Sequence, residues 1–316
     1  ETVRINNALG AICARVCPTE RYCQEGCSRS GIDKPIDIGR IQRYITDYEA
    51  TTKMDIWETK PLNGKKIAVI GSGPSGLTVA AELAMEGYQV TIYEKDAKAG
   101  GYLRYGIPEY RLPTSVVDQE IKRIVNLGVE IALNTRIGSD ITLKDLQKDN
   151  DAVIIAIGAS QGKMLPMFEN NRKVKLAVDW LKQVKSRRGK VKIPENVLVI
   201  GGGDVAMDTV TTLKLLGCPH VTDVVYEQFS EFRASKKELL GAQEQGVTII
   251  DGYVPTATSR GGIVKFKHRV IPSELKIKAD LIILAVGQQV DPAGLGLQIE
   301  RGEVKIEGNH IQDSNI

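Results

Sequence analysis

The chain of 316 residues lacks several features that whole classes of protein require. It has no run of 18 apolar residues, which argues against a membrane-spanning helix. Its N-terminus lacks the basic and then apolar stretch of a signal peptide, so we expect a cytoplasmic location. A net charge of only +3 argues against a polyanion-coating role, and 42% hydrophobic residues argue against disorder.

Cysteine is also scarce, but its distribution is uneven. Four of the five cysteines have the spacing C-x3-C-x5-C-x3-C, at Cys13, Cys17, Cys23 and Cys27. Such crowding in a cysteine-poor chain is typical of metal or cluster binding rather than of a secreted disulfide framework. Thiolates at this density favour an iron–sulfur cluster. Zinc, which prefers paired C-x2-C knuckles, and unliganded thiols stay open as alternatives.

The chain is long enough for two or three domains, and an internal repeat shows how they are organised. Residues 1–60 hold the cysteines and apolar residues at helical spacing, without a strand signal. A strand, a glycine-rich turn and a helix begin at residue 66, and the same pattern returns near residue 197, with Gly201 lying 130 positions after Gly71. Each copy closes with an apolar strand that ends in glycine, Gly158 and Gly287, 129 positions apart.

This pattern predicts an α/β fold: two nested Rossmann-like, three-layer domains, for FAD and NAD(P), preceded by a small α-helical iron–sulfur domain. We expect the helical domain at 1–60, the first part of the FAD domain at 61–165, the NAD(P) domain at 166–288 and a return to the FAD domain at 289–316. The second unit is inserted within the first, which favours the first as the flavin site.

The first glycine motif has the full context of a dinucleotide site. A strand precedes Gly71, Gly73 and Gly76, a helix follows them, and Glu94 lies 23 residues after Gly71. These glycines allow a tight turn, approach of a pyrophosphate and close packing of helix on strand, while Glu94 is placed to bind ribose hydroxyls.

The second motif, built on Gly201, Gly203 and Ala206, is followed by Glu227. A carboxylate at that position accepts a hydrogen bond from a ribose 2′-hydroxyl and repels a 2′-phosphate, which favours NAD(H) over NADP(H). Arg233 lies six residues further on and could offset this preference.

A flavin and a nicotinamide in one chain predict hydride transfer, which needs geometry more than an acid–base residue and fits the presence of only three histidines. We therefore name no catalytic side chain. Cys218 is the only cysteine after Cys27, so no redox dithiol can form beside the flavin and disulfide reductase activity is disfavoured. An iron–sulfur cluster offers the electrons another route.

At this point the sequence resembles a known family. Residues 6–20 (NNALGAICARVCPTE) and 35–40 (PIDIGR) are similar to the cluster domain shared by dihydropyrimidine dehydrogenase and the glutamate synthase small subunit. Residues 100–108 (GGYLRYGIP) resemble the flavin-domain signature of that superfamily, and residues 201–208 (GGGDVAMD) its nicotinamide domain. Over essentially its whole length, the chain most resembles the electron-input subunits of bacterial NAD-dependent dihydropyrimidine dehydrogenases.

The resemblance implies site residues. For [4Fe-4S] clusters it implies Cys17, Cys23, Cys27 and Gln42 as ligands, with Cys13 a non-ligand. For FAD it implies Gly71, Gly73, Pro74, Ser75, Gly76, Glu94, Lys95, Gly101, Tyr102, Leu103, Arg111, Ile137 and Gly158. For NAD(H) it implies Gly201, Gly203, Asp204, Val205, Ala206, Glu227, Arg233, Ala285, Val286 and Gly287.

The resemblance also implies an FMN-containing partner subunit that reduces uracil or thymine, since nothing in this chain looks like a pyrimidine site. We expect a hetero-oligomer, with no role in nucleic-acid or membrane binding. The family has further cysteine ligands upstream and a later Gly-Asp segment, so the sequence looks trimmed at both ends. A glutamate synthase small subunit or related NADPH reductase, and a regulatory flavoprotein, stay open as alternatives.

Overall fold

The computed structural model describes residues 2–54, 56–292, 294–300, 303–307 and 310–311. The chain divides into two compact units, residues 1–159 with 290–316, and residues 160–289. The boundaries predicted after residues 60, 165 and 288 stay predictions. No helix in the described part of the chain is both long and apolar enough to span a bilayer.

The first unit begins with the helices that carry the cysteine segment, α1 (Thr2–Asn6), α2 (Gly10–Val16) and α3 (Ile38–Thr52). Single 3₁₀ turns at Thr19–Arg21 and Ser28–Gly31 lie between α2 and α3. Asp37 caps α3 by accepting a hydrogen bond from the Arg40 amide. This segment is helical, as its periodicity predicts.

A four-stranded parallel sheet forms the centre of the first unit, in the order β3-β2-β1-β4. Its strands are β1 (Lys66–Ile70), β2 (Gln89–Tyr93), β3 (Glu130–Ala132) and β4 (Ala152–Ile155). Alternate residues of β1 face opposite sides of the sheet. Ile67 and Val69 pack in one core cluster, which also holds α2 residues such as Ile12, while Ala68 and Ile70 pack in another with Leu143.

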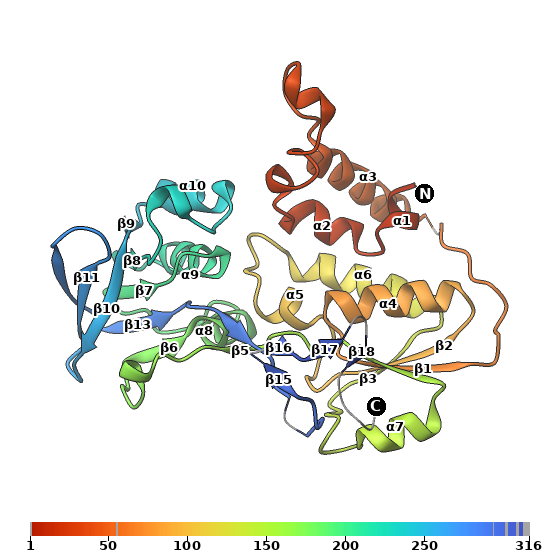
Figure 1. Cartoon of the computed structure of the whole chain (residues 1–316). Helices are drawn as coiled ribbons and strands as arrows, with labels where there is room; N and C mark the ends of the chain where they lie inside the picture. The colour runs from red at the N-terminus through yellow and green to blue at the C-terminus, as the bar shows by residue number, and fades with distance from the viewer. Residues whose placement is uncertain (1, 55, 293, 301–302, 308–309, 312–316) are drawn as a thin grey trace. The chain divides into compact units, whose positions relative to one another are not determined.

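Helices cover both faces of this sheet, as Figure 1 shows, with α4 and α6 on one side and α7 on the other. The bounds are α4 (Pro74–Met85), α5 (Gly101–Tyr105), α6 (Thr114–Asn126) and α7 (Leu143–Asp149). Short pairs close this unit: β15 (Ile299–Glu300) with β16 (Glu303–Val304), and β17 (Ile306–Glu307) with β18 (His310–Ile311).

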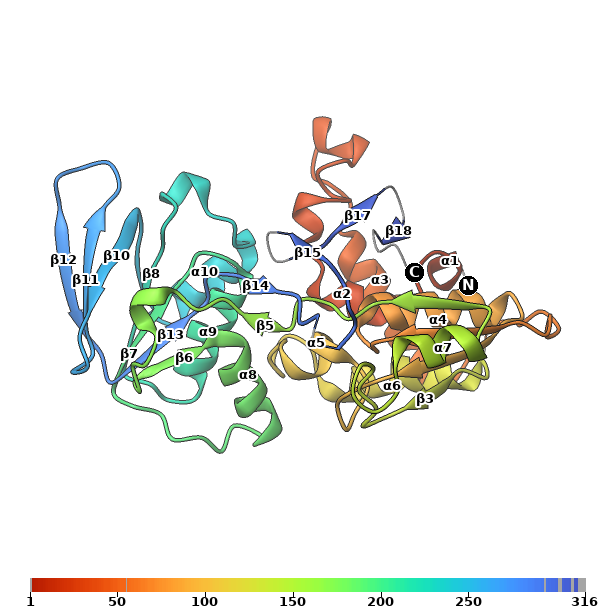
Figure 2. The ribbon, with the colours of Figure 1, turned by 60° about the horizontal axis from the view of Figure 1, so that its bottom comes forward.

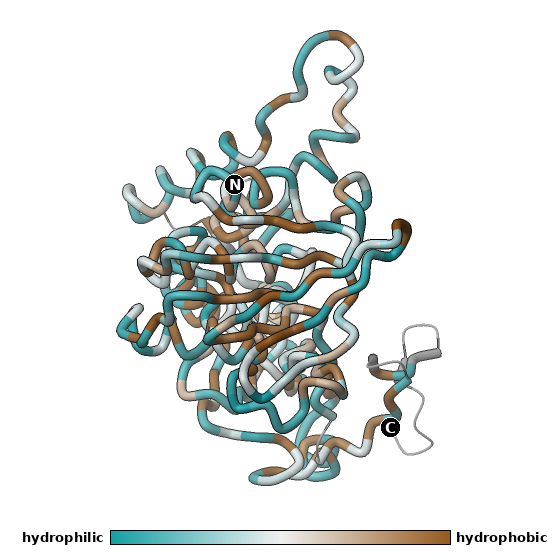
Figure 3. Tube along the Cα trace, turned by 90° about the vertical axis from the view of Figure 1, so that its left-hand side faces the viewer, coloured by the Kyte–Doolittle hydropathy of each residue, from teal (hydrophilic) through white to brown (hydrophobic). Residues whose placement is uncertain are grey.

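The second unit repeats this plan. Its parallel sheet has the order β6-β13-β7-β8-β9, so that β9-β8-β7-β13 corresponds to β3-β2-β1-β4. The strands are β6 (Val174–Leu176), β7 (Asn196–Ile200), β8 (His220–Val224), β9 (Thr248–Ile250) and β13 (Leu281–Leu284). Figure 3, viewed from the side of this unit, shows hydrophobic stretches along the extended segments of the chain.

Different layers cover the two faces of this second sheet. Helices α8 (Ala177–Ser186), α9 (Asp204–Leu215) and α10 (Lys236–Glu244) pack in one core cluster. An antiparallel sheet of β10 (Tyr253–Thr258), β11 (Ile263–His268) and β12 (Glu274–Lys278) packs in the other, and its strands lie side by side in Figure 2. A short pair, β5 (Gln161–Gly162) with β14 (Gln288–Gln289), and the 3₁₀ turns Pro166–Phe168 and Phe229–Glu231 complete the unit. The predicted α/β fold class is confirmed.

Candidate functional site

The first glycine loop joins β1 to α4 and depends on the absence of side chains. Gly71 has a φ of +104°, and a Cβ there would lie 2.4 Å from the Ala156 carbonyl oxygen. A Cβ on Gly76 would lie 1.9 Å from the Gly71 carbonyl oxygen. Gly73 has open space instead, and it begins α4 without a capping side chain. Pro74, the first residue of α4, has no N–H, so the first turn presents the amides of Ser75 and Gly76 and the positive helix end to an anionic group.

Glu94 is buried directly after β2, with 5% of its surface exposed. Its Oε2 accepts hydrogen bonds from the Ser72 amide, at 3.0 Å, and from the Ser72 hydroxyl. Its Oε1 accepts a hydrogen bond from the Asp96 amide at 2.8 Å. The carboxylate thus braces the glycine loop; ribose binding by Glu94 stays a prediction.

Helix α5 is tied to the same loop. The Gly100 amide donates to the Ser72 carbonyl oxygen at 3.1 Å, and a Cβ on Gly101 would lie 2.9 Å from the Gly73 Cα. The structure therefore brings Gly101, at the start of α5, to the glycine loop, whereas the ring of Tyr102 lies against Gly106.

The other predicted flavin residues are more dispersed. Leu103 and Ile137 are buried in two different core clusters of the first unit, so their side chains serve the fold. Lys95 follows Glu94, Arg111 lies shortly before α6, and Gly158, with a φ of +64°, has open space where a Cβ would point.

In the second unit the corresponding loop lines a cavity of about 590 Å³. A Cβ on Gly201 would lie 2.3 Å from the Ala285 carbonyl oxygen, which repeats the relation between Gly71 and Ala156. Gly203, like Gly73, has open space around the Cβ position. Of the ten predicted NAD residues, nine line the cavity; Ala206 is fully buried beneath it.

The charged groups at this cavity are paired. Arg233 Nε lies 3.2 Å from Glu227 Oε1, and the arginine side chain is 82% exposed while that of Glu227 is 19% exposed. Asp204, the first residue of α9, accepts a hydrogen bond from the Ser235 amide at 2.6 Å. Because Glu227 is held mainly by an exposed arginine, its carboxylate can exchange that partner for a ribose hydroxyl.

Sequence reasoning missed several residues that wall the cavity, among them Leu165, Met167, Tyr226, Tyr253 and Pro255. They come from segments between the motifs and share no spacing that marks them. Tyr226 offers the one usable signal, since it adjoins Glu227. The Arg269 guanidinium lies over its ring, 4.0 Å from the centroid.

The cysteines lie in the helical part of the first unit. Cys13 is on α2, Cys17 follows that helix, and Cys23 and Cys27 lie between α2 and α3. Burial raises the pKa of the Cys17 thiol, and neighbouring Cys13 and Cys23 add to the effect. Backbone hydrogen bonds from Ile36 and then Arg29 lower the pKa of Cys27.

Gln42 lies on α3 and is half-buried. Its Nε2 donates to the Gly10 carbonyl oxygen at 2.7 Å, so its side-chain oxygen is the atom that could bind iron. Thiol and amide-oxygen donors fit the implied cluster chemistry. Within the described residues, no three His, Cys, Asp or Glu side chains converge as a metal site. The segment therefore supplies donors of the kind that the implied clusters need.

Cys218 is separate from this segment. It is 2% exposed in the helical-side core of the second unit, and burial raises its pKa. It packs as a small hydrophobic residue, as expected.

Comparison with known proteins identifies the family. The family model described as pyridine nucleotide-disulphide oxidoreductase matches residues 65–315, and that of dihydropyrimidine dehydrogenase domain II, 4Fe-4S cluster, matches residues 1–54. The NAD-dependent dihydropyrimidine dehydrogenase subunit PreT of Escherichia coli K12 is 49% identical over 317 residues, covering 100% of this chain and 76% of the relative. The chain belongs to this family.

A second relative agrees with this assignment, and a solved structure agrees with the fold. PreT of Salmonella typhimurium is 52% identical over 288 residues, covering 91% of this chain and 70% of the relative. Mycobacterium tuberculosis FprA in complex with NADPH has a TM-score of 0.66 at 18% identity, covering 81% of this chain and 77% of that chain, and supports the fold alone. The family resemblance predicted from the sequence is thus confirmed: the chain combines a pyridine nucleotide oxidoreductase domain with a 4Fe-4S domain.

Proposed function

We propose that the chain is the electron-input subunit of an NAD-dependent dihydropyrimidine dehydrogenase. It binds NADH in the second unit and FAD in the first, and it delivers electrons through [4Fe-4S] clusters to a partner subunit that reduces uracil or thymine to the 5,6-dihydro form. When bound, the flavin would accept a hydride and release electrons singly to the clusters. We further propose that the partner carries FMN and the pyrimidine site.

The observation that carries this proposal is the repeated glycine geometry. Gly71 and Gly201 each lie against the carbonyl oxygen of an alanine just after the closing strand, Ala156 and Ala285. Gly73 and Gly203 each leave the start of a helix open. Two phosphate cradles of this kind in one chain favour one nicotinamide and one flavin, and the cysteine segment supplies donors for the clusters.

The residues of each unit would bind different cofactors. The first turn of α4 would hold the FAD pyrophosphate, and Tyr102 and Arg111 would add to the FAD site. The first turn of α9 would hold the pyrophosphate of NADH. Glu227 would bind the adenosine ribose and favour NADH, since its carboxylate repels a 2′-phosphate. Cys17, Cys23, Cys27 and Gln42 would act as cluster ligands.

The test is to copurify the chain, with its cofactors, together with its partner subunit and to measure NADH-dependent reduction of uracil. The chain without the partner is the control and should reduce an artificial electron acceptor but no pyrimidine. Pyrimidine reduction by this chain alone, or none by the pair, would contradict the proposal.

Arg233 favours a second candidate, an NADPH-linked reductase such as a glutamate synthase small subunit. The Arg233 side chain is 82% exposed beside the Glu227 carboxylate, and its guanidinium could bind a 2′-phosphate. That function predicts a preference for NADPH in the acceptor assay and activity with a glutamate synthase large subunit. A regulatory flavoprotein would instead keep its flavin oxidised when NADH is added.

A further inference from the structure

Arg4, on α1, is the most deeply buried arginine in the described chain, with 2% of its surface exposed. Its Nε donates to Glu49, at 2.9 Å to Oε2, and its Nη2 donates to both Glu49 Oε2 and Glu120 Oε1 at 2.7 Å. Its Nη1 donates to Glu120 Oε2 at 2.7 Å and to the Ala8 carbonyl oxygen at 2.9 Å. All five N–H donors of the guanidinium are therefore engaged.

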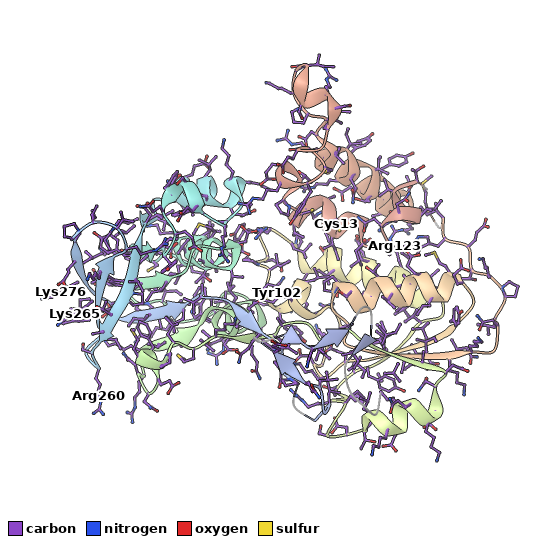
Figure 4. The ribbon with its side chains drawn as sticks, viewed as in Figure 1. Cys13, Tyr102, Arg123, Arg260, Lys265 and Lys276 are labelled. Atoms are coloured by element: carbon purple, nitrogen blue, oxygen red, sulfur yellow. The ribbon has the colours of Figure 1, made fainter. Side chains whose placement is uncertain are left out.

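The two carboxylates come from parts of the chain with different tasks. Glu49 is on α3, the helix that carries Gln42, whereas Glu120 is on α6, which packs on the sheet of the proposed flavin site. Arg123, also on α6 and labelled in Figure 4, donates to Glu49 Oε1 at 2.6 Å. Glu120 Oε2 also accepts from the Ala11 amide on α2 at 3.3 Å.

These four side chains, Arg4, Glu49, Glu120 and Arg123, form an ion cluster with no net charge. Burial alone would lower the pKa of Arg4, but the hydrogen bonds and charges of Glu120 and Glu49 outweigh it, so the pKa lies above its ordinary value. The guanidinium is therefore charged whenever the protein is folded at physiological pH.

Such a cluster is poorly suited to adding stability, because desolvation of buried charges offsets much of their attraction and apolar side chains often serve as well. Hydrophobic packing between the N-terminal helices and α6 is already provided by Ala8, Leu9 and Ile12, which share a core cluster with Val117 and Ile124 of α6. A guanidinium that donates two hydrogen bonds to each of two carboxylates instead fixes the orientation and register of the helices that carry them, because each pair of N–H groups must align with its carboxylate. The cluster thus specifies where α2 and α3 sit on α6.

That placement matters for the cysteine segment. Cys13 lies on α2 and Cys17 follows it, while Gln42 of α3 holds the Gly10 carbonyl oxygen at the start of α2. At the other end, α6 begins three residues after Arg111. The ion cluster therefore links α3, which carries Gln42, and α2, which precedes Cys17, to α6, the helix that follows Arg111.

We propose that Arg4 and Glu120 are positioning residues that set the separation between the iron–sulfur helices and the flavin fold, and so the rate of electron delivery to the clusters. This inference rests on the proposed function. Electron transfer between two cofactors slows steeply as their separation grows, so a displacement of α2 and α3 relative to α6 would lower this rate.

The test compares Arg4→Met with Arg15→Met in the full chain. Arg15 is a matched control, because its side chain is 8% exposed and pairs with Asp47 at 2.5 Å, but this contact joins α2 to α3 and leaves α6 out. After anaerobic mixing with NADH, flavin reduction is followed by absorbance and cluster reduction by freeze-quench electron paramagnetic resonance. Iron content is measured for each variant.

We expect Arg4→Met to slow cluster reduction about tenfold, with flavin reduction within about twofold of the parent rate. Arg15→Met should leave the ratio of the two rates unchanged. If Arg4→Met does not fold, Arg4→Lys serves, since it keeps the charge but loses the fork and should slow only cluster reduction. Unchanged cluster reduction, or an equal slowing of both steps, would overturn the inference.

Hydrogen exchange in the cofactor-free chain gives a second readout. Loss of the guanidinium should speed amide exchange of Gly10–Val16, whose Ala11 N–H is held by Glu120, and leave α8 of the second unit unchanged. Unaltered exchange in Gly10–Val16 would contradict the positioning role even if no cofactor is bound. If instead NADH fails to reduce the flavin of the parent chain, it is the proposed function that fails.

Discussion

Both nucleotide units place a glutamate after the second strand of the sheet, but the two carboxylates have different surroundings. Glu94 is buried and accepts hydrogen bonds from Ser72 and Asp96, so it is part of its loop before any ligand arrives. Glu227 is held by an exposed arginine and lines an open cavity. Two copies of one motif therefore place the same residue type in different surroundings: Glu94 braces its loop, whereas Glu227 faces the cavity, where we propose that it selects the nucleotide.

The same comparison exposes a difference inside the sheets. Ile92 of β2 pairs in register with Val69 and Ile131, and Asp223 of β8 pairs in the same way with Val199 and Ile249. Both side chains are fully buried. Neither carboxylate oxygen of Asp223 has a hydrogen-bond partner among the described residues. The second unit therefore carries a polar group where the first has a hydrocarbon.

The largest effect is expected from Gly76→Ala. Its Cβ would lie 1.9 Å from the Gly71 carbonyl oxygen, so α4 must shift away from the loop. We expect a loss of about 1–3 kcal/mol in the free energy of unfolding and a roughly tenfold fall in flavin content after purification. The second unit supplies the control, since it already has an alanine there: Ala206→Gly should cost only about 0.5–1 kcal/mol. Full flavin content in Gly76→Ala would break the comparison.

Asp223→Ile gives the second unit the residue type of the first. We expect a gain of about 1–3 kcal/mol in the free energy of unfolding, because an unpaired buried polar group is removed. Burial raises the pKa of Asp223, so the folded chain keeps a proton that the unfolded chain has released. Stability of the parent chain should therefore fall as pH rises from the ordinary aspartate pKa towards the raised native value.

Urea unfolding across this pH range checks that prediction, and Asp223→Asn is its control. The asparagine variant should lose the pH-dependent contribution but, as it keeps a polar group, gain less stability than Asp223→Ile. An isoleucine variant less stable than the parent at every pH would refute the account of Asp223.

Glu227→Ala addresses the ribose end of the cavity. Loss of the carboxylate should reduce the preference for NADH over NADPH by about tenfold, because the Glu227 charge that repels a 2′-phosphate is removed beside the Arg233 guanidinium. The ratio of kcat/KM values for the two nucleotides, measured with an artificial acceptor, reports the change. Arg233→Ala should move the ratio the other way, and an unchanged ratio in both variants would remove Glu227 from the selection of the nucleotide.

The smallest effect is expected from Gly203→Ala. Nothing lies within 4 Å of the Cβ position, so the free energy of unfolding should change by less than about 0.5 kcal/mol. The added methyl group would face the proposed pyrophosphate site and raise the KM for NADH, measured by steady-state kinetics, about fivefold. Gly73→Ala is the counterpart and should lower flavin affinity without altering the KM for NADH.

Local signals in the sequence predict the frame of these sites. Gly201 lies 130 positions after Gly71, and Ala285 lies 129 positions after Ala156. The structure shows the same contact in both units, Gly71 with Ala156 and Gly201 with Ala285, because each glycine turn and each closing strand repeats in the sequence. The cavity wall at Met167 and Tyr253 was not predicted, since distant segments meet there. Neither was the pairing of Arg4 with Glu120, 116 positions apart.

We propose that this chain passes a hydride from NADH in the second unit to FAD in the first. The most direct test is anaerobic rapid mixing of the cofactor-loaded chain with NADH. The absorbance of oxidised flavin at about 450 nm is followed over time. The experiment is then repeated with NADPH. The account predicts rapid bleaching by NADH and much slower bleaching by NADPH. Flavin that stays oxidised with NADH, or that NADPH reduces faster, would contradict it.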